Sequence, residues 1–98
     1  MSSQRVTRRL QDLQRRISDV REGCRVLDEQ LAVWSESLED ARLRSLMAET
    51  PQSDHDLADV RRHHDVAQRE RDRRGAEIEQ LIAERDRLLR DWTPKEVS

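Results

Sequence analysis

Apolar residues in the first half of the chain recur at alternating spacings of four and three positions. This spacing repeats every seven residues, which is typical of a helix that buries one narrow stripe, or seam, against a partner helix. No proline interrupts the run before position 51. We therefore predict a helix at about residues 3–49. Its predicted seam consists of Val6, Leu10, Leu13, Ile17, Val20, Cys24, Leu27, Leu31, Trp34, Leu38 and Ala41.

The segment Thr50-Pro51-Gln52-Ser53, at residues 50–53, is the predicted turn. A residue before proline is pushed out of the helical region, and proline is favoured at the first position of a new helix, so Thr50 is a candidate N-cap. Ser53, with Asp56 three residues later, is a second, competing candidate. A second helix is predicted at about residues 54–92, because Thr93-Pro94 should end it. Its seam keeps the same spacing but is less apolar: Leu57, Val60, His64, Ala67, Arg71, Arg74, Ile78, Leu81, Arg85, Leu88 and Trp92.

Antiparallel pairing of these helices decides which residues should face one another. The fold class is then all-α, a long antiparallel two-helix hairpin with its turn centred near residues 51–52. In this register the apolar ends of the second helix meet apolar parts of the first. We therefore prefer a hairpin folded on itself to one continuous rod. The predicted pairs are Leu57 with Leu46, Val60 with Leu43, and Ala67 with Trp34.

The middle of the second helix is nearly all charged, so part of the first seam should be poorly covered. The facing residues are mainly arginines and a histidine, whose stems alone can cover apolar surface. Each half-exposed large side chain costs about 1–2 kcal/mol. We expect a second copy of the chain, in a four-helix bundle, or another protein partner to cover this stripe. The stripe consists of Leu27, Leu31, Trp34 and Leu38.

The composition agrees with an elongated helical fold. Charged residues make up 41% of the 98 positions and hydrophobic residues 34%, which suffices for a narrow seam but not for a broad core. We treat residues 1–98 as one helical-hairpin domain with frayed residues 1–2 and 94–98. There is no apolar run near the roughly 20 residues of a membrane span and no secretory signal, so we expect a cytoplasmic protein. Lys95 is the single lysine among 19 basic residues, which is typical of a GC-rich bacterial genome.

No cluster of residues predicts catalysis. Enzymes need a concave site that excludes water, and a two-helix hairpin offers none. His63 and His64 are adjacent and point in different directions on a helix, and Asp59 with His63 supplies only two of the ligands that zinc needs. Cys24 holds a seam position, which predicts a buried thiol. We therefore expect a non-enzymatic protein without a cofactor, a metal or a small-molecule substrate.

Carboxylates gather around the predicted turn. Residues 28–59 contain nine acidic residues against two arginines, a net charge of −7. A helical hairpin with an acidic turn resembles the coiled-coil arm of Gre-type and DksA-type factors, which insert such a tip into RNA polymerase. The resemblance covers the tip only, and the globular docking domain of those factors is missing. It implies a transcription accessory factor that acts through Glu49, Asp54 and Asp56.

Arginines gather at the opposite, open end of the predicted hairpin. Residues 1–27 contain seven arginines against three acidic residues, a net charge of +4. A nucleic-acid-binding structural protein could use this end to contact phosphates. The chain has no asparagine of the kind that leucine-zipper proteins use to read bases, and its net charge of −2 argues against nucleic acid. The arginines concerned are Arg5, Arg8, Arg9, Arg15 and Arg16.

A further resemblance covers most of the chain. The segments Glu39-Asp40-Ala41-Arg42, Glu49-Thr50-Pro51 and Asp86-Arg87-Leu88-Leu89 are similar to short actinobacterial coiled-coil proteins, for which no activity is established. The resemblance implies a bacterial helical hairpin and no more. The sequence therefore favours an adaptor or regulatory protein that acts through protein–protein contacts, with the transcription accessory factor and the nucleic-acid-binding protein as alternatives.

Overall fold

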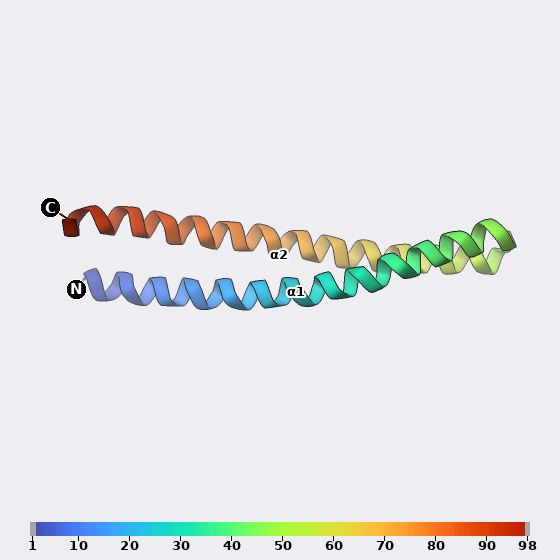
Figure 1. The fold of residues 1–98 in the computed structure, drawn as a ribbon, viewed down its shortest axis with the longest axis horizontal. Helices are drawn as coiled ribbons and strands as arrows, with labels where there is room; N and C mark the ends of the chain where they lie inside the picture. The colour runs from blue at the N-terminus through green and yellow to red at the C-terminus, as the bar shows by residue number, and fades with distance from the viewer. Residues whose placement is uncertain (1, 98) are drawn as a thin grey trace. The chain divides into compact units, whose positions relative to one another are not determined.

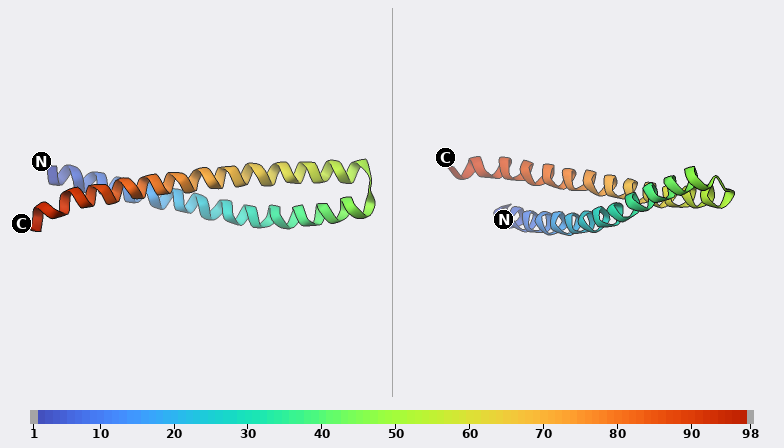
Figure 2. Two further views of the ribbon diagram at one scale, coloured as in Figure 1. Left: turned by 90° about the horizontal axis from the view of Figure 1, so that it is seen from above. Right: turned by 45° about the vertical axis from the view of Figure 1, so that its right-hand side comes forward.

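The computed structural model describes residues 2–97, and the side chains of residues 3–92, as two helices joined by a turn. Helix α1 spans Ser2–Ala48 and helix α2 spans Pro51–Val97. Figure 1 shows α1 turning back into α2, and Figure 2 shows the same turn from two further directions. The predicted all-α, antiparallel two-helix hairpin is confirmed.

Helix α2 is longer than predicted at both ends. It begins at Pro51 rather than near residue 54, because proline fits the first helical position and needs no amide partner there. It also continues through Pro94 to Val97, since the missing N–H of Pro94 removes a single hydrogen bond near the helix end. Of the residues expected to fray, 2 and 94–97 are helical, and 1 and 98 lie outside the described residues.

Side-chain and backbone contacts at Glu49 and Thr50 account for the turn. The Ser53 amide donates to the Thr50 hydroxyl oxygen at 3.1 Å, so Thr50 is the N-cap of α2. Ser53 reaches back, and its hydroxyl donates to the Thr50 carbonyl at 2.9 Å. Glu49 directly follows α1 and lies in the left-handed region with φ 51°, and its amide donates to the Ser45 carbonyl at 3.1 Å. These contacts satisfy some of the backbone groups that the ends of the two helices leave without a partner within the helix.

The hairpin divides into two compact units. The terminal unit comprises Met1–Gly23 with Arg74–Ser98, and the turn unit comprises Cys24–Arg73. The predicted seams are confirmed in both, because every buried apolar residue that the structure describes holds a seam position. The terminal unit buries Leu13, Ile17, Val20 and Leu81, and the turn unit buries Cys24, Leu38, Ala41 and Ala67.

The predicted register was wrong by about one helical turn, or roughly four residues. Trp34 stacks on His63 instead of lying opposite Ala67. The earlier start of α2 is the cause, because it moves the turn toward the N-terminus and shifts every facing pair. Leu43 and Leu46 consequently lose the partners assigned to them and are exposed.

Candidate functional site

The predicted partner-binding stripe is more covered than the sequence suggested. Leu38 is buried at 8% exposure, whereas the predicted register left it facing His64 and half-exposed. Leu27, Leu31 and Trp34 are half-buried. Three of the four predicted residues are therefore still partly exposed, and Leu38 is not available to a partner.

Two side chains of α2 help to cover the stripe. The Trp34 and His63 rings are stacked, with their centroids 4.7 Å apart and an angle of 9° between their planes. Arg71 is half-buried, and its Nε donates to the Asp28 carboxylate at 2.7 Å. That hydrogen bond is the largest cause that raises the pKa of Arg71. A guanidinium held in this way keeps its stem along the seam.

The three acidic tip residues are exposed, and two of them are engaged in local contacts. The Ser45 hydroxyl donates to the Asp54 carboxylate at 2.5 Å, which ties the first turn of α2 to the last turns of α1. The Gln52 amide donates to the Asp56 carboxylate at 2.9 Å. Asp54 also lies in the first turn of α2, where the helix dipole favours negative charge. Stabilisation of the turn is thus sufficient to explain Asp54 and Asp56.

Most of the predicted basic residues are paired with carboxylates. Arg9 contacts Glu84 at 2.6 Å across the helices, Arg15 contacts Asp12 at 3.1 Å, and Arg16 lies 4.0 Å from Glu77. Phosphate binding would have to compete with these pairs. The arrangement therefore resembles the ion-paired flank of a coiled coil more than a nucleic-acid interface.

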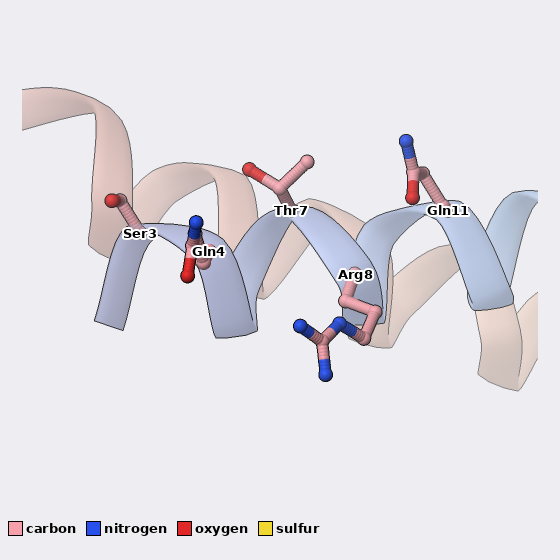
Figure 3. A pocket seen from close by; sticks show the side chains of 5 residues that line it. All are labelled: Ser3, Gln4, Thr7, Arg8 and Gln11. Atoms are coloured by element: carbon pink, nitrogen blue, oxygen red, sulfur yellow. The ribbon is translucent and has the colours of Figure 1, made fainter. Parts of the chain in front are cut away.

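Arg5 and Arg8 are exposed near the start of α1. Arg8 lines a shallow surface hollow together with Ser3, Gln4, Thr7 and Gln11, all of them from α1. In the view of Figure 3, Thr7 and Gln11 project above the ribbon and the Arg8 guanidinium group lies below it. These polar groups do not converge on one point, so they do not form a site for an anion.

The remaining reactive side chains do not form a cluster. Cys24 is buried at 5% exposure, as its seam position predicted. Asp59, considered above as a ligand beside His63, instead contacts His55 and Arg62. Among the described residues, no group of three or more His, Cys, Asp or Glu side chains is placed to hold a metal ion.

The most exposed apolar surface was not predicted. Leu43, Leu46 and Met47 are 58%, 74% and 83% exposed, and we call these three residues the tip patch. They lie at positions i, i+3 and i+4, so they share one face over the last turns of α1. That face is opposite the seam, where α2 cannot reach it. Met47 also lines a shallow hollow that continues around the turn past Ala48, Thr50 and Ser53.

The sequence contained a signal for this patch. After Ala41 the apolar residues leave the seam spacing and continue at positions 43, 46 and 47. The predicted register hid the signal, because it assigned Leu57 and Val60 as partners to Leu46 and Leu43. A helix that begins at Pro51 would have left both leucines without a partner.

Comparison of the chain with models of protein families, with curated proteins and with solved structures finds no match. No helix among the described residues is long and apolar enough to cross a membrane.

Proposed function

We propose that the chain is a non-enzymatic adaptor or regulatory protein that docks on a larger protein through the tip patch. The observation that carries this proposal is the exposure of Leu43, Leu46 and Met47 side by side on one helix face. Single exposed apolar residues are normal, but a contiguous group of large ones is characteristic of an interaction surface. These residues contribute nothing to the seam, so folding of the hairpin does not account for them.

Docking through the tip patch is favoured over docking through the predicted stripe. Leu38 is buried, and Trp34 is stacked on His63, so a partner would gain less apolar contact at the seam. The four-helix bundle of two copies remains a prediction that no contact tests. The cytoplasmic location also stays a prediction.

Photo-cross-linking tests the proposal. A benzophenone amino acid replaces Met47 in one variant and Arg87, an exposed residue of the terminal unit, in a matched control. In extracts of the source organism, the probe at position 47 should give a discrete adduct with another protein, and the probe at position 87 should not. Excess wild-type chain should compete the adduct away, while the variant Leu46→Ser with Met47→Ser should not. Equal competition by both chains would refute the proposal.

A further inference from the structure

Three carboxylates share the outer face of α1 with the tip patch. Glu36, Glu39 and Asp40 precede Leu43, Leu46 and Met47 by seven residues each. Seven residues make about two helical turns, so each carboxylate lies on the same face as the apolar residue that follows it. We call these three residues the acidic triad; all of them are exposed. The outer face thus combines an apolar half and an acidic half.

The acidic triad differs from most other carboxylates of the turn unit, although Glu49 likewise has no side-chain contact within the part of the chain that the structure describes. Asp28, Asp54 and Asp59 each have a contact within the chain. Among the described residues, no hydrogen bond or ion pair engages the carboxylates of the acidic triad. The face that leaves three apolar side chains without a partner therefore also leaves three charges without one.

Charge decides what kind of molecule can cover this face. Residues 28–59 have a net charge of −7, from nine acidic residues against two arginines. Two copies that met through this face would bring like charges together, which disfavours self-association there. Nucleic-acid phosphates and anionic lipid headgroups are repelled for the same reason. A basic partner gains both apolar contact and electrostatic attraction.

The shape of the face favours a helix as the partner. The acidic triad and the tip patch lie along one helix surface, whose own backbone groups are already hydrogen-bonded and cannot accept a β-strand. We infer that this face binds an amphipathic helix of another protein, with apolar residues against the tip patch and Lys or Arg side chains against the acidic triad. The inference rests on the proposed function and specifies the chemistry of its partner.

Binding of designed peptides tests this inference directly. The probe is a fluorescent helical peptide of about 18 residues, five turns, with leucine at helical spacing and lysine elsewhere. A second peptide replaces every lysine by glutamate, and a third scrambles the leucine and lysine order. Fluorescence anisotropy should detect binding of the first peptide and much weaker binding of the other two. Raising NaCl to about 0.5 M should weaken binding, because exposed charges are then screened.

Two variants locate the contact. Glu36→Gln with Glu39→Gln and Asp40→Asn should weaken peptide binding by about tenfold, since three attractive charges are lost. Leu46→Ser with Met47→Ser should also weaken it. The matched control neutralises the same number of exposed carboxylates in the terminal unit and should leave binding unchanged; it carries Asp19→Asn, Glu79→Gln and Asp91→Asn.

The outcomes separate this inference from the proposed function. The inference of a basic helical partner would be refuted if the triad variant and its control weakened binding equally. It would also be refuted if the glutamate peptide bound as tightly as the lysine peptide. If the cross-link at position 47 then persisted, docking would stand with a partner of different chemistry, and if it also failed, both proposals would fall. Sedimentation that shows a dimer of the wild type but a monomer of Leu46→Ser with Met47→Ser would identify a second copy as the occupant and overturn the inference.

Discussion

The seam of the terminal unit and the tip patch of the turn unit place similar side chains in opposite environments. Leu13 and Ile17 have no exposed surface, whereas Leu46 and Met47 are 74% and 83% exposed. All four belong to α1, so position on the helix, not residue type, decides the difference. The comparison separates apolar residues that hold the hairpin together from apolar residues that folding leaves unused. It also predicts which substitutions affect stability and which affect binding.

Truncation in the seam should have the largest effect. Leu13→Ala removes a fully buried side chain, and we expect it to lower the free energy of unfolding by about 2–4 kcal/mol. Urea titration followed by circular dichroism measures the change. Met47→Ala, a similar truncation at the tip patch, is the control. Similar losses for both variants would contradict the division between seam and patch.

Removal of the N-cap should have an intermediate effect. Thr50→Ala deletes the hydroxyl that accepts from the Ser53 amide, and we expect a loss of about 1 kcal/mol. Thr50→Ser keeps a hydroxyl and should retain most of the stability. If the alanine and serine variants melt at the same temperature, the cap does not stabilise α2. The packing of the seam alone would then determine where α2 begins.

Glycine at position 49 should stabilise the turn. Glu49 has φ 51°, a conformation that costs an L-residue about 1–2 kcal/mol but is open to glycine. Because glycine also makes the unfolded chain more flexible, we expect Glu49→Gly to gain a net amount of about 0.5–1 kcal/mol. Glu49→Ala keeps the Cβ atom and serves as the control. An equal gain from alanine would assign the effect to the lost charge instead.

Polar substitution in the tip patch should have the smallest effect on stability. Leu46→Ser with Met47→Ser should change the free energy of unfolding by less than about 0.5 kcal/mol, because both side chains are already largely in water. The same thermal or urea measurements test this expectation. A loss comparable to that of Leu13→Ala would mean that the patch packs against the hairpin in solution.

The sequence was sufficient for the seam and for the approximate position of the turn. Heptad spacing specified which face of α1 is buried, and Thr50-Pro51 specified where the chain reverses. It was insufficient for the register, because capping alone did not distinguish a helix that begins at Pro51 from one that begins three residues later. That small difference decided the environment of Leu38, Leu43 and Leu46. The candidate site depends on the register, and this is why it was missed.

The buried seam has a practical consequence at Cys24. This residue carries the only thiol of the chain, and 5% of it is exposed. A thiol reagent such as Ellman's can reach the sulfur atom only when the helices separate locally. The rate of modification therefore reports how often the hairpin opens at this point, on the native protein and without an introduced label.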